Sequence, residues 1–194
     1  MWSDNYAGQL KNRMLLFLYM FLVTNGFFHT IDHKFLIPGH SFSSLDCDFA
    51  LIEKHTIHCK LQTVEDIKTA IVTARPSQPF KVLDMGNKNF FDFDHVSSKY
   101  IDTSKLGISK ATWLQITRDL TGVVFYKTNY SDIACWEKCC VMKAGITENH
   151  IKTATLPSLN DEIPLSELKK RDLIKMLDFM SEETKQYFSR ILSV

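Results

Sequence analysis

One apolar segment restricts the possible folds of this chain more than any other feature. Ten consecutive apolar residues run from Met14 to Val23, whereas a helix that crosses a bilayer needs about 20. Apolar side chains keep helical spacing and fill most of the remaining circumference, which predicts a helix from Gly8 to Thr24 that is buried on nearly all sides. Asn25-Gly26 ends it, because glycine tolerates the left-handed conformation at helix ends. The segment therefore predicts the central helix of a protein core and no membrane partner.

The composition is that of a folded domain without a strong overall charge. The 194 residues are 45% hydrophobic and 23% charged, which is enough apolar side chain for one compact domain rather than a disordered chain. The formal net charge is +1, so any nucleic acid must be held by a local patch. The five cysteines form an odd set that cannot pair completely within one chain, which favours a reducing compartment, nuclear or cytoplasmic.

Strands and helices alternate in the first part of the chain. A strand is predicted from Thr30 to Ile37, and helices from Asp46 to His55 and from Val64 to Thr73. This alternation favours a parallel sheet with right-handed crossovers, and therefore an α/β fold. His33 and Phe35 share one face of the predicted strand, so we expect His33 to pack or to form hydrogen bonds there.

The pattern changes after Arg75-Pro76, which ends the preceding helix. Beyond it, strands are predicted at Phe80–Leu83, Thr112–Thr117 and Gly122–Tyr126. A weakly patterned loop from Lys143 to Ile163 follows them, and then a helix from Leu165 to Phe179 and a last helix that begins at Ser181. The fold class is therefore α/β in the N-terminal part and mixed α+β in the C-terminal part. We expect three regions, residues 1–75, 76–164 and 165–194, packed as one compact unit.

Two carboxylates occupy equivalent places in this predicted arrangement. Asp4 follows the end of a first strand, and Asp46 comes just after the end of the second. The carboxyl ends of parallel strands meet at the edge of an α/β sheet where ligands bind. A pair of acids there can share Mg²⁺ or Mn²⁺, which prefer oxygen ligands and can clamp a phosphoryl displacement. Taken singly, each acid also has a local explanation, a turn at Asp4 and a helix N-terminus at Asp46.

Three segments carry a resemblance to a known family. They are Trp2–Arg13 (WSDNYAGQLKNR), Ile31–Ser41 (IDHKFLIPGHS) and Asp46–Lys54 (DCDFALIEK). Together they resemble an uncharacterised domain that is common in transposon-like proteins of insects and other animals. Tyr6 stands where that family usually has cysteine, and Leu10 stands where it usually has asparagine.

The same layout resembles the second half of ribonuclease H-like transposases and integrases. This resemblance implies that Asp4 is the second metal-binding acid and Asp46 the third, with Glu53 as a competing candidate on the same helix. The first acid should then lie upstream, in a missing half of the same protein. The implied fold of the N-terminal part is a partial ribonuclease H-like domain.

The function implied by the resemblance is a transposon-derived, metal-dependent nuclease or transposase module that acts on DNA. Gln9, Lys11 and Asn12, at the start of the predicted central helix, would contact phosphate or support the acids. Without the upstream acid, the chain should cleave little or no DNA in Mg²⁺ or Mn²⁺. The alternative is a non-catalytic domain that binds nucleic acid or protein, so whether the chain is an enzyme stays open.

A basic stretch from Lys99 to Tyr130 offers a second connection to nucleic acid. It carries five lysines and arginines against two aspartates, a local net charge of +3. Aromatic residues are interleaved with these charges, so we expect Lys110 and Arg118 to contact phosphates while Trp113 stacks on a base. Ordinary amphipathic strands give the same pattern, and that alternative also stays open.

Overall fold

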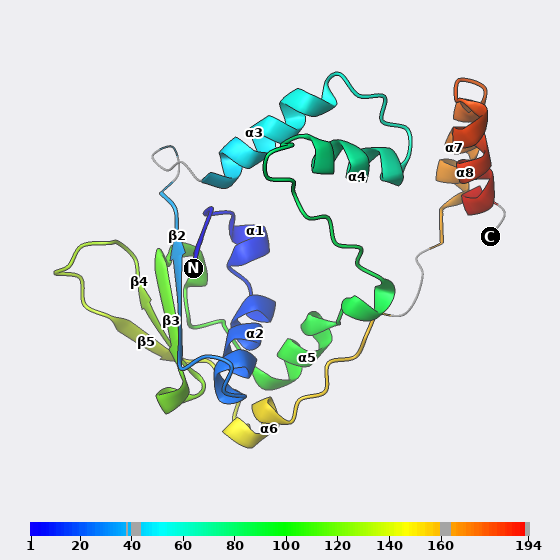
Figure 1. The fold of residues 1–194 in the computed structure, drawn as a ribbon. Coiled ribbons are helices and arrows are strands. Elements are labelled where there is room, and N and C mark those ends of the chain that lie inside the picture. The colour runs from blue at the N-terminus through cyan, green and yellow to red at the C-terminus, as the bar shows by residue number, and fades with distance from the viewer. Residues whose placement is uncertain (38, 40–43, 160–163, 193–194) are drawn as a thin grey trace. The chain divides into compact units, whose positions relative to one another are not determined.

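The computed structural model describes residues 1–37, 39, 44–159 and 164–192. The chain forms two compact units, each assembled from two separate stretches (Figure 1). The first unit comprises Met1–Ser41 and Lys88–Leu159, and the second comprises Phe42–Asn87 and Asn160–Val194. Residues 1–75, expected as one region, thus contribute to both units.

A five-stranded mixed sheet forms the framework of the first unit. Its strands lie side by side in sequence order: β1 (Trp2–Ser3), β2 (Thr30–Phe35), β3 (Trp113–Thr117), β4 (Val123–Lys127) and β5 (Glu137–Cys140). β1 pairs with β2 in parallel, and the other three pairs are antiparallel. The predictions of a mixed α/β fold and of a parallel first pair are confirmed.

The predicted central helix is in fact two helices, α1 (Ala7–Leu10) and α2 (Arg13–Thr24). Asn12 separates them, because its backbone is extended and its side chain accepts a 2.9 Å hydrogen bond from the N–H of Leu15. This is a helix N-cap, so the prediction of one continuous helix is wrong. The predicted end is confirmed, since Gly26 follows α2 with φ 83°. No described helix is long and apolar enough to cross a membrane.

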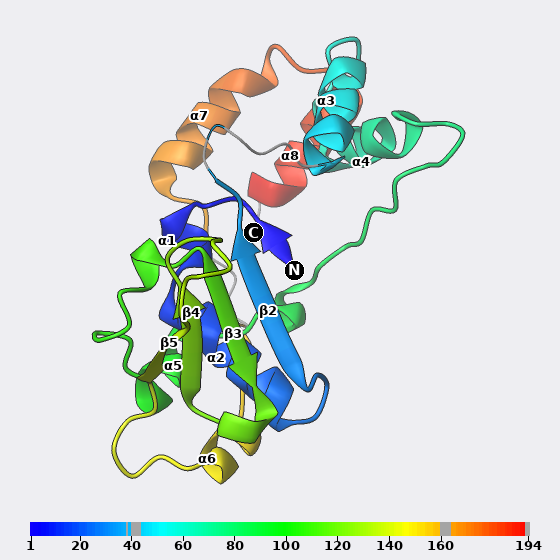
Figure 2. The same ribbon diagram turned by 90° about the vertical axis from the view of Figure 1, so that its left-hand side faces the viewer.

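The helix α2 contributes most to the core of the first unit. With α5 (Phe93–Tyr100) it lies on one side of the sheet (Figures 1 and 2). Fifteen buried apolar residues of this unit form a single cluster, which includes Phe17 and Met20 of α2. Because burying one such side chain contributes about 1.5 to 3 kcal/mol, this cluster is the main stabilising feature of the unit.

Three elements of the first unit were not predicted: α5, β5 and α6 (Glu148–Lys152). The four residues of β5 show no alternation of apolar and polar side chains, and only their pairing with β4 makes them a strand. Two short 3-10 helices complete the unit, η2 (Ile108–Lys110) and η3 (Arg118–Leu120). A third, η1 (Asn87–Asn89), begins at the last residue of the second unit's first stretch. Elements this short have too few residues for a periodic pattern to identify them.

His33 is fully buried in this core and joins three elements. Its Nε2 lies 2.7 Å from the hydroxyl of Ser3 in β1, and its Nδ1 lies 2.9 Å from the hydroxyl of Tyr19 in α2. Burial, followed by the nearby N-terminal ammonium and Lys11, lowers the pKa of His33 to about 4. The ring is therefore neutral at pH 7, and the prediction that it packs and forms hydrogen bonds is confirmed.

Helices make up the regular structure of the second unit's described residues: α3 (Ser44–Thr56), α4 (Val64–Thr73), α7 (Glu167–Leu177) and α8 (Glu182–Leu192). Each predicted end lies within two residues of the observed one. Local signals explain this agreement. At the start of α4, for example, the Thr63 hydroxyl accepts from the N–H of Asp66, and the Asp66 carboxylate accepts from the N–H of Thr63, which is a complete capping box.

The strand predicted from Phe80 to Leu83 is wrong. Residues 79–86 have no regular secondary structure. A strand exists only where another strand supplies hydrogen-bonding partners, and Pro79 removes one backbone donor at the start of this segment. The apolar pattern alone is therefore insufficient here.

Candidate nucleic-acid interface

The two faces of the sheet have different surroundings. Successive residues of a strand point to opposite faces, and the buried side chains of His33, Phe35, Leu114 and Ile116 define the face that meets the core. No α-helix among the described residues of the first unit lies over the opposite face (Figure 2). By the strand register, the outward positions there include Asp32, Lys34, Trp113, Gln115, Phe125, Lys127 and Lys138.

Aromatic rings and lysines alternate across this outward face. The Nζ of Lys34 lies 3.8 Å from the centre of the Trp113 ring and 5.2 Å from that of Trp2. The Nζ of Lys127 lies 5.7 Å from the Trp113 ring and 5.2 Å from the Trp136 ring. The rings of Trp113 and Trp136 are 4.9 Å apart. We call this set the aromatic–lysine face; its members are Trp2, Lys34, Trp113, Lys127, Tyr130 and Trp136.

The outer rings of the aromatic–lysine face are open to solvent, whereas the central ring is not. Trp2 is 59% exposed and Trp136 is 37% exposed, but Trp113 is half-buried. Lys34 and Lys127 both approach the ring of Trp113, so this ring holds two ammonium groups by cation–π contact. Neither lysine forms an ion pair with a carboxylate in the described part of the chain.

Asp32 is the one acid at the outward strand positions, and it fixes the orientation of two neighbours. Its Oδ1 accepts a 2.7 Å hydrogen bond from the indole N–H of Trp113 and a 3.0 Å hydrogen bond from the amide of Gln115. Hydrogen bonds to an ionised acceptor are stronger than neutral ones. The central ring of the aromatic–lysine face is therefore anchored at its polar edge.

Tyr130 fixes the loop between β4 and β5 at the end of the sheet. Its hydroxyl lies 2.5 Å from the carbonyl oxygen of Phe35 and 2.7 Å from that of Thr112, and donates to these acceptors. Burial raises the pKa of Tyr130, so the hydroxyl keeps its proton. The ring lies 5.9 Å from the ring of Trp2, which extends the series of aromatic contacts to β1.

The sequence profile of a family described as a domain of unknown function (DUF7869) matches residues 1–132. The chain belongs to this family. No curated protein and no solved structure matches it. The DUF7869 match contains every member of the aromatic–lysine face except Trp136, which follows it in the loop before β5.

Within the DUF7869 segment, the residues predicted from the basic stretch have different positions. Trp113 belongs to the aromatic–lysine face, while Lys110 is exposed in η2, before β3 begins. Arg118 follows β3, and its Nε donates a 3.2 Å hydrogen bond to the carbonyl of Val23 at the end of α2. The structure therefore places one of the three residues on the outward face and gives Arg118 a contact with the backbone of α2.

Lys11 and Asn12 have structural partners. Lys11 is 7% exposed, its Nζ donates to the carbonyl of Ser109 at 3.1 Å, and burial lowers its pKa. Asn12 caps α2 and donates through Nδ2 to the carbonyl of Gln9 at 2.7 Å. These contacts hold the connection between α1 and α2 in place, whereas the side chain of Gln9 is exposed.

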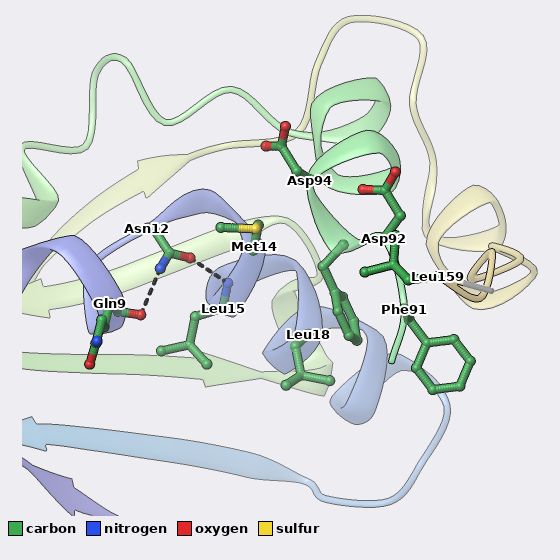
Figure 3. A pocket seen from close by; sticks show the side chains of 10 residues that line it. Gln9, Asn12, Met14, Leu15, Leu18, Phe91, Asp92, Asp94 and Leu159 are labelled. Atoms are coloured by element: carbon green, nitrogen blue, oxygen red, sulfur yellow. Dashed lines mark hydrogen bonds between the residues drawn. The ribbon is translucent and has the colours of Figure 1, made fainter. Parts of the chain in front are cut away.

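Gln9 and Asn12 also border a pocket of about 430 Å³ on the helical side of the unit (Figure 3). Its lining is mainly apolar and includes Leu15 and Leu18 of α2. Its polar groups have local partners; for example, Arg13 pairs with Asp94 at 2.7 Å. The pocket therefore offers apolar surface and few unengaged polar groups.

The three predicted acids divide between the two units. Asp4 directly follows β1 in the first unit, is exposed, and accepts a 3.3 Å hydrogen bond from the N–H of Tyr6. Asp46 and Glu53 are exposed on α3 of the second unit. Among residues 1–37, 39, 44–159 and 164–192, no three His, Cys, Asp or Glu side chains are grouped so that they could hold a metal ion.

Three members of the aromatic–lysine face were missed at the level of sequence: Trp2, Lys34 and Trp136. For Lys34 a signal existed, because it alternates with His33 and Phe35 and must point away from them. Trp2 and Trp136 join the face only through the pairing of β1 with β2 and of β4 with β5. No local pattern contains that information.

Proposed function

We propose that this protein binds single-stranded DNA through the aromatic–lysine face. The observation that carries the proposal is the alternation of aromatic rings with lysines on a sheet face that no α-helix of the same unit covers. Lysines attract the phosphate backbone, and rings stack on bases. These are the two components that sequence-tolerant binding of single strands requires.

The exposure of the rings favours a single strand over a duplex. Trp2 and Trp136 are exposed, and an exposed ring can stack on unpaired bases but not on paired ones, because paired bases are covered by their neighbours. Trp113 contacts both Lys34 and Lys127, but Lys127 is buried, with 9% of its surface exposed. The role of Trp113 is therefore to position the ammonium group of Lys34 for phosphate. Lys138, on the same face of β5, adds a third cation.

Fluorescence anisotropy with a labelled oligonucleotide tests this proposal. If about three phosphates are neutralised, the slope of log K against log[salt] is near −2 for a single strand. Lys34→Gln and Lys138→Gln should each flatten this slope. Trp2→Ala and Trp136→Ala should each lower affinity by about 1 to 3 kcal/mol and leave the slope unchanged. Lys99→Gln, on α5 and exposed, is the matched control and should change neither.

If the cation–π contacts serve only to stabilise the sheet, the result is different. The folded protein then shows no salt-dependent DNA binding at low ionic strength, and Trp2→Ala changes only stability. Equal losses of affinity in Lys99→Gln and Lys34→Gln would likewise show that charge acts without regard to position, which contradicts a defined face.

A second candidate function is metal-dependent phosphodiester chemistry in a ribonuclease H-like module derived from a transposase. It is favoured by the position of Asp4, immediately after a strand that pairs in parallel with β2, where α/β sheets bind ligands. Asp4 would be one of the groups that hold Mg²⁺ or Mn²⁺. The bound ion would supply Lewis-acid stabilisation of phosphate charge.

The paramagnetic effect of Mn²⁺ on water relaxation tests this second candidate without requiring activity. If Asp4 holds the ion, Asp4→Asn abolishes Mn²⁺ binding, whereas Asp102→Asn, which changes an exposed acid elsewhere in the first unit, leaves Mn²⁺ binding intact. Mn²⁺ binding that survives in Asp4→Asn, or no Mn²⁺ binding at all, would contradict a metal site at Asp4.

A further inference from the structure

We infer that Asp32 makes the aromatic–lysine face selective for bases that carry an amino group at the pairing edge, cytosine above all among the pyrimidines. This inference rests on the proposed binding of single-stranded DNA and names the bases that the face prefers. Asp32 lies on the outward side of β2, two residues from Lys34. Outward positions along a strand are about 7 Å apart, so a base stacked beside Lys34 reaches Asp32 with its edge.

The two carboxylate oxygens of Asp32 have different surroundings. Oδ1 accepts from both Trp113 and Gln115, which fixes the plane of the group. Oδ2 has no hydrogen-bond partner among the described residues, and it does not belong to the buried polar atoms without a partner. Because Asp32 is only partly buried, Oδ2 is an acceptor that solvent reaches and that its neighbours hold in a fixed direction.

A carboxylate at this place serves no purpose for phosphate binding. It opposes the attraction that Lys34 exerts on a polyanion, and a neutral acceptor would hold the indole N–H of Trp113 as well. Its distinctive property is that it accepts strongly and cannot donate when ionised. A base edge that donates is therefore favoured next to it, and a base edge that only accepts is repelled.

The pyrimidines differ in this respect at a single position. Cytosine carries an amino group at C4, which donates to carboxylates, whereas thymine and uracil carry an accepting oxygen there. The uracil oxygen would face the lone pairs of Oδ2, and the amino group of cytosine would donate to them. Discrimination by one such contact corresponds to about a tenfold difference in affinity.

The experiment compares oligodeoxycytidine with oligodeoxyuridine of equal length at neutral to mildly alkaline pH. We expect the wild-type protein to bind oligodeoxycytidine about tenfold more tightly. In Asp32→Asn the side chain still accepts from Trp113 but presents an amide N–H at the second position, so the preference should disappear or reverse towards oligodeoxyuridine. Asp102→Asn, the matched control, should keep the wild-type ratio.

The ratio of the two affinities does not depend on the fraction of active protein, so partial unfolding of Asp32→Asn leaves the test valid. Equal affinities in the wild-type protein, or an unchanged ratio in Asp32→Asn, would overturn the role of Asp32 while the proposed function stands. Failure of the wild-type protein to bind either oligonucleotide would instead overturn the proposed function itself.

Discussion

Fifteen buried apolar residues form one cluster in the first unit, whereas Ala70 is the one buried apolar residue in the described part of the second unit. The second unit instead exposes large apolar side chains on its helices, such as Phe49 at 67% and Leu168 at 69%. The first unit is therefore stabilised by a core that joins distant segments. The described helices of the second unit bury little apolar surface. They are held by polar contacts, such as the capping box of α4 and the 3.0 Å ion pair between Arg75 and Asp48 of α3.

This difference teaches that regular secondary structure and stability are separate properties. Isolated helices of about 12 residues are marginal in water, and burial of an apolar face usually supplies most of their stability. The helices α3, α4, α7 and α8 each have between 10 and 13 residues. We therefore expect the two units to respond differently to perturbation, and four measurements test this comparison.

The largest expected difference is in amide hydrogen exchange. Amides of α2 should exchange only through global unfolding, while amides of α3 and α7 should exchange through local opening that requires several kcal/mol less, because few buried contacts oppose it. Native-state exchange followed by NMR or mass spectrometry measures both. Equal protection of α2 and α7 would show that the units unfold together.

Truncation of a core side chain should have the next largest effect. Phe17 is fully buried and its ring stacks on that of Tyr100 at 5.8 Å, so Phe17→Ala should cost about 3 to 5 kcal/mol of unfolding free energy. Phe179, after α7 in the second unit, is 88% exposed, and Phe179→Ala should cost less than about 0.5 kcal/mol.

Urea denaturation followed by tryptophan fluorescence measures these two values. All three tryptophans, Trp2, Trp113 and Trp136, lie in the first unit, so the signal reports on that unit. A similar loss of stability in Phe17→Ala and Phe179→Ala would contradict the assignment of the core.

Acid should destabilise the first unit through His33. Its folded-state pKa of about 4 lies below the usual 6.5, so the unfolded chain binds the proton more readily. The stability contributed by the neutral ring is complete above the unfolded pKa and is lost as pH falls towards about 4. Between about pH 7 and pH 5 the loss should be about 2 kcal/mol.

The variant His33→Gln removes this titration and should flatten the pH dependence over that range. His58→Gln, which changes an exposed histidine of the second unit, is the control and should leave the slope as it is in the wild-type protein. An unchanged slope in His33→Gln would show that another group causes the acid sensitivity.

The smallest effects should come from removing helix caps. The effect should be global for a cap in the first unit and local for a cap in the second. Asn12→Ala and Thr63→Ala each remove a side-chain acceptor at a helix N-terminus, which costs about 1 kcal/mol. Because α2 belongs to the core, Asn12→Ala should lower the global unfolding free energy. Thr63→Ala should instead increase exchange in α4 alone. Global destabilisation by Thr63→Ala would show that α4 unfolds together with the core.

The sequence determined the features that depend on neighbours along the chain. The helices of the second unit follow from periodicity and caps, and the end of α2 follows from Gly26, since helical hydrogen bonds and side-chain contacts join residues three or four positions apart. The inward position of His33 follows from its alternation with Phe35. The break at Asn12 was encoded as well, but the helical pattern of the apolar residues on both sides, Leu10 and Met14–Val23, led to the prediction of one continuous helix.

Only the tertiary structure decided which residues share the outward face of the sheet. Trp2, Lys34, Trp113 and Trp136 come from four separate segments, and strand pairing with a specific register brings them together. Asp32 meets Gln115 across such a pair, 83 positions away in the chain. The physical reason is that sheet hydrogen bonds join residues at any separation in the chain, so the sequence of one strand does not identify the strand that pairs with it. In a helix, by contrast, the hydrogen-bonding partners lie within the same segment.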